Sequence, residues 1–172
     1  MRMRYIRLTA VLLLLACGDG ETTPTSPPTP PTPVATSITL SATTLSFSSV
    51  GATQQLSATV KDQNGGTMSG ATVTWATTEA AVATVSSSGL VTSVGNGTGS
   101  VLAVSGSING TAAVTVAQVV STLELSPSGT NLSSVGDTIT LSATVKDSGG
   151  STIPDATVTW ATSDTLIATV SS

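Results

Sequence analysis

The sequence contains two copies of one unit, and this repeat constrains the fold more than any other feature. Residues 34–87 align with residues 119–172 without a gap and share 29 identities in 54 positions. The heptapeptide ATVTWAT stands in both copies, at 71–77 and again at 156–162. Tandem copies are usually built from one folding unit per copy. We therefore predict two domains, one over residues 34–118 and one over 119–172.

Within each copy the pattern predicts short β-strands separated by turns. Over residues 54–62 the apolar Leu56, Ala58 and Val60 alternate with Ser and Thr, which turns one apolar face toward a core. Gly65-Gly66 supplies a turn, and Gly-Asn and Asn-Gly pairs further along are typical of hairpin turns. Seven or eight short strands in about 85 residues predict an all-β fold, a β-sandwich or barrel.

The two tryptophans mark the predicted cores. Trp75 is in phase with the apolar Val73 on its strand, and the second copy repeats this pairing. The six predicted core residues are Leu56, Val73 and Trp75 in the first copy and Leu141, Val158 and Trp160 in the second. An alternative is that each indole is an exposed platform on which a sugar stacks, but the in-phase position favours the core.

The repeat resembles a known family, the bacterial immunoglobulin-like domain of group 2, which is found in intimin- and invasin-like surface proteins. The resemblance is carried by Gly51 before Leu56, Thr74-Trp75, VATV at 82–85, Gly89-Leu90-Val91, Gly97 and a final VTV. It implies tandem immunoglobulin-like β-sandwiches. The family has no catalytic residue to transfer, so the resemblance indicates a fold and not a reaction.

The second copy stops at Ser172, before any counterpart of residues 88–118. We therefore expect the 119–172 domain to be incomplete at its C-terminus, with open strand edges that invite pairing with another strand. The expected explanation is that the sequence is a fragment of a longer multi-repeat protein, and the alternative is a strand donated by another chain.

The N-terminus predicts export and lipidation. Residues 1–16 combine a basic start with a short apolar run, as in a signal peptide, and the run ends at Cys17. Cys17 is the only cysteine, and Leu14-Leu15-Ala16-Cys17 resembles the lipobox of bacterial lipoproteins. An ordinary signal peptide with an incidental cysteine is the alternative. Residues 17–33 then form a Pro/Thr-rich tether. The expected location is the outer membrane or the cell surface.

Charge and composition exclude several classes of function. After residue 17 the chain carries two basic and nine acidic residues, a net charge of 2 − 9 = −7, which argues against binding of nucleic acid. Without histidine there is no Ser-His-Asp triad, so no catalytic residue, metal or cofactor is predicted. Calcium at Asp62 or Asp147 is a weak alternative, because each lies beside a lysine. The simpler interpretation is a charge that keeps a strand end soluble.

The predicted function is that of a lipid-anchored surface protein, a stalk or cell-adhesion module and not an enzyme. Its predicted partners are the membrane, reached through the N-terminal lipid, and a protein or glycan ligand on another surface. The alternative is an accessory segment, a spacer or carbohydrate-binding part, of a larger surface enzyme acting on polysaccharide.

Overall fold

The computed structural model describes residues 30–171, and this part of the chain is all-β with no helix. The predicted signal peptide, Cys17 and most of the tether lie outside the described residues. The strands are β1 (Ala35–Leu40), β2 (Thr44–Phe47), β3 (Thr53–Gln55), β4 (Ala58–Asp62), β5 (Thr74–Thr77), β6 (Ala83–Val85), β7 (Leu90–Ser93), β8 (Gly97–Ser105), β9 (Ile108–Val116), β10 (Val120–Ser126) and β11 (Ser142–Asp147).

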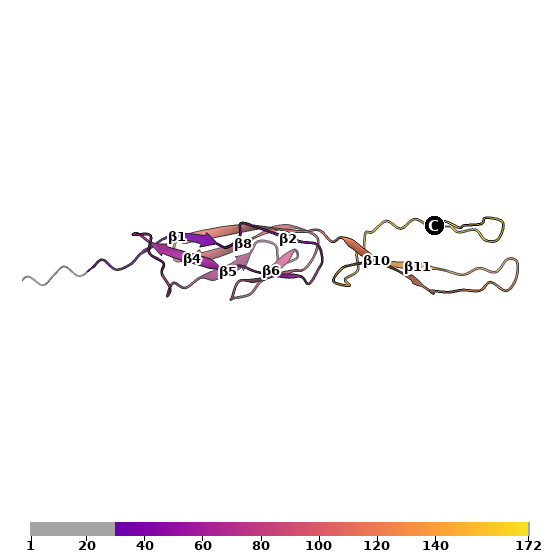
Figure 1. Cartoon of the computed structure of the whole chain (residues 1–172), viewed down its shortest axis with the longest axis horizontal. Coiled ribbons are helices and arrows are strands. Elements are labelled where there is room, and N and C mark those ends of the chain that lie inside the picture. The colour runs from indigo at the N-terminus through magenta and orange to yellow at the C-terminus, as the bar shows by residue number, and fades with distance from the viewer. Residues whose placement is uncertain (1–29, 172) are drawn as a thin grey trace, which may run out of the picture. The chain divides into compact units, whose positions relative to one another are not determined.

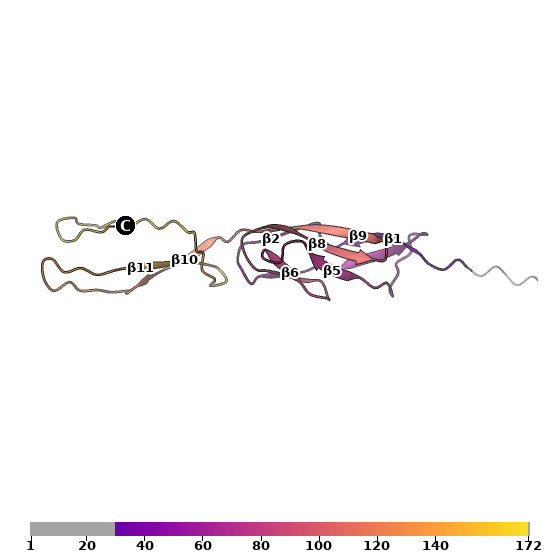
Figure 2. The ribbon, with the colours of Figure 1, turned by 180° about the vertical axis from the view of Figure 1, so that it is seen from behind.

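The first nine strands form a β-sandwich, seen from the two sides in Figures 1 and 2. One layer is a four-stranded sheet in the order β2-β9-β8-β5. The other contains the sheet β3-β7-β6 and the pair β1-β4. β3 and β4 follow each other along the chain, separated only by Leu56 and Ser57. They correspond to the single strand predicted over residues 54–62, which therefore links the two parts of this layer.

The longest pairing is the antiparallel hairpin of β8 and β9, which is in register from Gly97↔Val116 to Ser105↔Ile108. Its turn is formed at Gly106, which has a φ of 59°, and not at an Asn-Gly pair as predicted. Asn109 and Gly110 instead lie inside β9. A Cβ at Gly110 would be 3.3 Å from Ile38 Cγ2, so a glycine here lets β1 approach closely.

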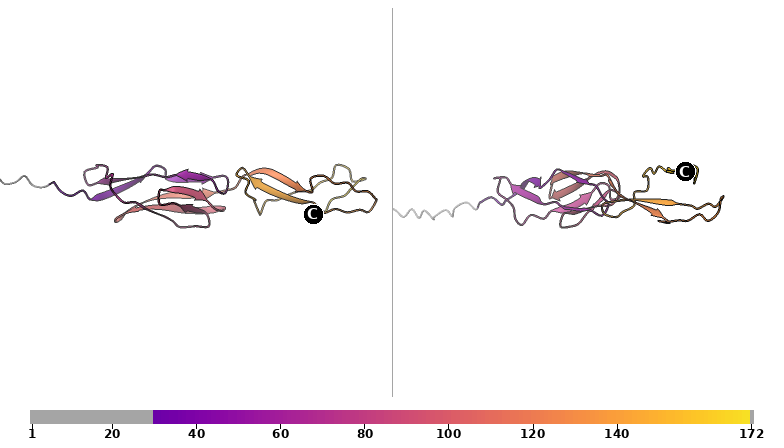
Figure 3. Two further views of the ribbon diagram at one scale, coloured as in Figure 1. Left: turned by 90° about the horizontal axis from the view of Figure 1, so that it is seen from below. Right: turned by 45° about the vertical axis from the view of Figure 1, so that its right-hand side comes forward.

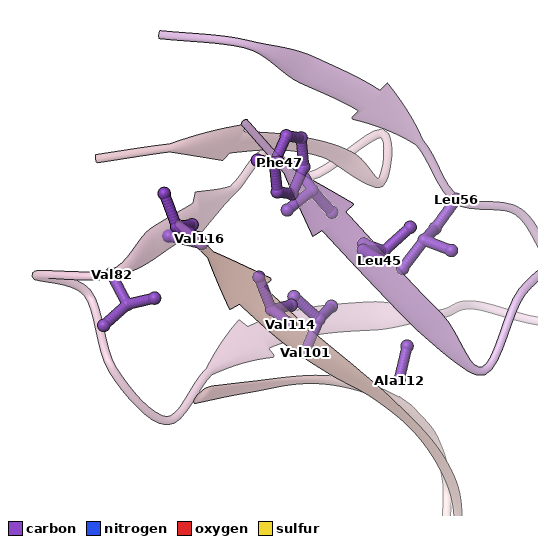
Figure 4. Close-up of a cluster of buried hydrophobic side chains, with 10 residues drawn as sticks. Leu45, Phe47, Leu56, Val82, Val101, Ala112, Val114 and Val116 are labelled. Atoms are coloured by element: carbon purple, nitrogen blue, oxygen red, sulfur yellow. The ribbon is translucent and has the colours of Figure 1, made fainter. Parts of the chain in front are cut away.

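The core lies between the two layers. Its buried cluster is formed by Leu45, Phe47, Leu56, Val82, Ala83, Val91, Val101, Ala112, Val114 and Val116. Figure 4 shows side chains from several strands converging on this cluster. Apart from Phe47 the cluster is aliphatic, so it is filled by Val, Leu and Ala rather than by rings. Each fully buried Val or Leu contributes roughly 1.5–3 kcal/mol of transfer free energy, which makes this cluster the main stabilising element.

The second repeat begins as the first one does. β10 pairs antiparallel with β11 from Val120↔Asp147 to Ser126↔Ser142, and β1 pairs with β4 in the equivalent register from Ala35↔Asp62. Both pairings contain an irregularity at the same point, after the first residue of β10 or β1. The β10–β11 pair is visible in orange and yellow in Figure 3.

The remaining predicted strands of the second repeat are not formed. Residues 156–162, identical in sequence to 71–77, have no strand, whereas Thr74–Thr77 forms β5 in the first repeat. The physical reason is the partner, since β5 pairs with β8 and the second repeat contains no counterpart of β8 among its described residues. The backbone N–H and C=O groups of a strand need hydrogen-bond partners on a neighbouring strand, so a strand-like sequence without such a neighbour does not form a strand.

Candidate functional site

Trp75 lies on β5 opposite Ala103 of β8, partly buried and packed against the core cluster. The indole also lies against Gly89, which has a φ of +83°. A Cβ added at Gly89 would be 2.9 Å from Trp75 Cζ2 and 2.5 Å from the Leu56 carbonyl oxygen. The turn that contains Gly89 therefore covers one edge of the ring. This position suits a core residue better than a platform for sugar, and the assignment stays a prediction.

The other predicted core residues differ in burial. Leu56 is fully buried, while Val73, Val158 and Trp160 are partly buried. Leu141 is 36% exposed among the described residues, and its placement in a second core stays a prediction. The equivalent residue of the first repeat, Leu56, lies in the buried cluster with residues of the strands that follow it. Its N–H group also donates to the carbonyl oxygen of Gly89. The described part of the second repeat has no segment equivalent to residues 88–118.

Asp62 and Asp164 are held in turns, and the acidic residues of the described part of the chain do not gather into a metal site. Asp62 Oδ1 accepts from the N–H groups of Asn64 and Gly66, at 2.9 and 2.8 Å. Asp164 Oδ1 similarly accepts from Leu166 N at 2.8 Å. Across residues 30–171 no group of three or more His, Cys, Asp or Glu side chains lies close enough to hold a metal ion. These contacts are those of carboxylates that stabilise loops.

Asp147 differs from Asp62, although the two occupy the same position of the repeat. Its side chain is only 2% exposed, so it is not the solvated charge at a strand end that the sequence suggested. The hydrogen bond from the Gln118 side chain holds the pKa of Asp147 below its ordinary value of 3.8. The N–H groups of Val50, Ser151 and Gly149 act in the same direction, while burial opposes them. Asp147 is therefore ionised at neutral pH.

One open pocket lies at the start of the first repeat, beside the β4–β5 connection. It is lined by Pro33, Asp62, Thr67, Met68, Ser69, Gly70 and Ala71. It contains one carboxylate and no neighbouring base or second carboxylate, so its residues provide neither a nucleophile with its base nor an acid–base pair.

The membrane anchor predicted at Cys17 falls in the part of the chain that the structure does not describe. Within residues 30–171 no helix is long and apolar enough to cross a membrane.

Sequence reasoning missed two residues that contact Asp147, namely Val50 and Gln118. Neither carries a charge or a motif. The available signal was a difference between the copies, since Asn64 of the first repeat is replaced by Gly149 in the second. A Cβ at Gly149 would lie 3.2 Å from the Val50 carbonyl oxygen.

Comparisons with known proteins agree with this architecture. Residues 34–116 match the family described as Bacterial Ig-like domain (group 2). Ice-binding protein 1 of Shewanella frigidimarina (strain NCIMB 400) is 36% identical over 124 residues, which cover 70% of this chain and 14% of that protein. The chain thus spans about one seventh of the curated relative it matches.

Solved structures of the S-layer protein SbsC are also similar. The crystal structure of domains 4 and 5 is 26% identical, with a TM-score of 0.46, and the match covers 50% of this chain and 54% of that one. The structure of domains 5-6 is 22% identical with a TM-score of 0.46, and the match covers 69% of this chain and 65% of that one.

Proposed function

Because residues 34–116 are a bacterial Ig-like domain of group 2, we propose that the chain is a surface-anchored bacterial lipoprotein whose tandem immunoglobulin-like repeats act as a stalk or cell-adhesion module. The lipid is attached at Cys17, and residues 17–33 tether the first repeat to the membrane. The proposal assigns the described residues a structural role. It is supported by a sandwich whose interior is filled mainly by aliphatic side chains and whose Asp62 carboxylate is held in its own turn.

The observation that carries the proposal is the immediate restart of the fold. β9 ends at Val116 and β10 begins at Val120, so only three residues separate the last strand of the first repeat from the first strand of the second. All three are bonded to the first repeat, since Ala117 N donates to the Phe47 carbonyl, Gln118 N to Asn96 Oδ1 and Val119 N to the Ser48 carbonyl. A short, bonded connection favours repeats held one after another, which is what a stalk requires.

The ice-binding relative is compatible with this role. The matched segment is 14% of a much longer protein, as expected if such repeats carry or space other parts of a surface protein. The relative's name describes that protein and assigns no ligand here.

The stalk function is tested by measuring reach. A fluorescent reporter is joined after Ser172, and energy transfer from the reporter to a membrane dye is compared between the full chain and a chain lacking residues 34–118. β9 alone spans nine residues, about 30 Å at roughly 3.3 Å per residue. Deletion is therefore expected to raise energy transfer, and a Cys17→Ser chain, released from the membrane, should abolish it.

Equal transfer with and without residues 34–118 would refute the stalk. If the deletion instead left reach unchanged and reduced polysaccharide degradation by an attached enzyme, the accessory role would be the correct one.

A further inference from the structure

The carboxylate of Asp147 accepts hydrogen bonds from both repeats. Oδ1 accepts from the N–H groups of its own turn, Gly149 and Ser151, each at 2.9 Å. Oδ2 accepts from residues of the first repeat, Val50 N at 2.9 Å and Gln118 Nε2 at 2.8 Å. All four donors are uncharged, so the negative charge is stabilised by N–H dipoles alone.

The residues of the first repeat that meet Asp147 are themselves held in place. Ser93 of β7 fixes the turn that contains Val50, because its Oγ donates to the Ser49 carbonyl at 2.7 Å and its N–H donates to that of Ala52. Asn96 orients Gln118, accepting from Gln118 N at 2.8 Å and donating to Gln118 Oε1 at 3.2 Å. The donors are therefore arranged before Asp147 arrives, which reduces the entropy lost on contact.

Asp62 provides an internal comparison. It shares with Asp147 the preceding lysine, the glycine of positive φ three residues on (78° at Gly65, 83° at Gly150) and the two turn hydrogen bonds to Oδ1. Within residues 30–171 the carboxylate of Asp62 accepts hydrogen bonds from its own turn, through Asn64 N and Gly66 N, whereas its backbone carbonyl accepts from Thr36 Oγ1. The turn geometry is thus common to both copies, whereas the hydrogen bonds from Val50 and Gln118 to Oδ2 are particular to Asp147.

Gly149 shows that the approach is close. An added Cβ there would meet the Val50 carbonyl oxygen at 3.2 Å, Asp147 Oδ1 at 3.3 Å and Ser49 Cβ at 3.4 Å. Asn64 occupies the equivalent position in the first repeat. The smaller residue occurs in the copy whose turn meets another domain, so the difference between the copies follows from the space available.

From these contacts we propose that Asp147 is a junction residue that locks the β11 turn of the second repeat onto the end of the first, through Val50 and Gln118. The partner surface is the end of the preceding repeat, formed by the Ser49–Ala52 turn and Gln118. The lock fixes the angle between successive repeats. It goes beyond the proposed stalk function, because it holds whatever the protein binds or carries.

The test measures amide hydrogen exchange at Val50 in the full chain, by NMR or fragmentation mass spectrometry. Asp147→Asn places an NH₂ group against the donors that surround the carboxylate, and exchange at Val50 should accelerate by about tenfold or more. Gly149→Val blocks the approach sterically while keeping every donor and acceptor, and should also accelerate it. The matched control Asp62→Asn alters the same turn away from the junction and should leave Val50 exchange unchanged.

Faster exchange in both junction variants, with the control unaffected, supports the lock. Parent-like exchange in either junction variant, or equal acceleration in Asp62→Asn, overturns it. None of these outcomes depends on reach from the membrane, so the lock and the stalk fail independently.

Discussion

Replacing Trp75 by alanine tests whether this residue supports the core or binds a sugar. The indole packs against the buried cluster and against the backbone at Gly89, which has no side chain to fill the space left behind. Truncation of a buried Trp costs about 3–5 kcal/mol, and since Trp75 is only partly buried we expect about 3 kcal/mol. In a domain of this size that lowers the melting temperature by about 12–24 °C.

The assay is thermal unfolding of residues 34–118, followed by circular dichroism, with Val104→Ala as the control. Val104 lies on the neighbouring β8 and is 36% exposed, so its truncation should cost only about 0.5 kcal/mol. A Trp75→Ala domain that melts within about 3 °C of the parent would refute the core assignment. If that domain also lost binding to glycans, the stacking platform would be the correct interpretation.

The remaining expectations concern the anchor, one glycine, the second repeat and acid. Cys17→Ser should move the protein out of the membrane fraction, and full retention there would exclude lipid as the anchor. Gly89→Ala should lower the free energy of unfolding by about 2 kcal/mol or more in denaturant, because φ is +83° and the new Cβ meets a carbonyl oxygen; an unchanged midpoint contradicts this. Appending a copy of residues 88–118 to the end of the chain should slow amide exchange in β10 and β11, and unaltered exchange would show that these strands need no cover. The lowered pKa of Asp147 means that its contribution to stability is complete above pH 3.8 and is lost only as pH falls below that value; NMR signals of its hydrogen-bonded amides should therefore stay constant from pH 7 to about 4.

The repeat was predictable from the identities between its two copies, and the sandwich from the local alternation of apolar and polar residues. The pattern at Leu56, Ala58 and Val60 placed β4 correctly and indicated which side faces inward. The absence of a strand at residues 156–162 was not predictable from the heptapeptide ATVTWAT itself, since the identical residues of the first repeat form β5 where β8 lies beside them. Likewise, the Asn-Gly pair at 109–110 is typical of a turn, but it lies inside β9. Its glycine lets β1 pack closely against this strand.

The candidate site was less predictable. Sequence placed Asp62 and Asp147 as equivalent strand-end charges, and their turns are indeed alike. They differ in one long-range contact, from Val50 to Asp147 across 97 residues of sequence, and the periodicity of a strand does not predict a contact between repeats. The sequence shows only that Gly149 replaces the Asn64 of the first repeat, and the structure gives the reason for this difference.

The parallel pairing of β2 with β9 determines how the first repeat responds to load. The chain enters the domain ahead of β2 and leaves it after β9, and the two strands run side by side from Thr44↔Ala113 to Phe47↔Val116. Tension applied to the two ends pulls these strands past each other in opposite directions. The hydrogen bonds between them are then sheared together instead of opening one after another. A domain connected in this way should extend abruptly at a high rupture force, which single-molecule stretching would measure, and should stay folded under smaller pulls.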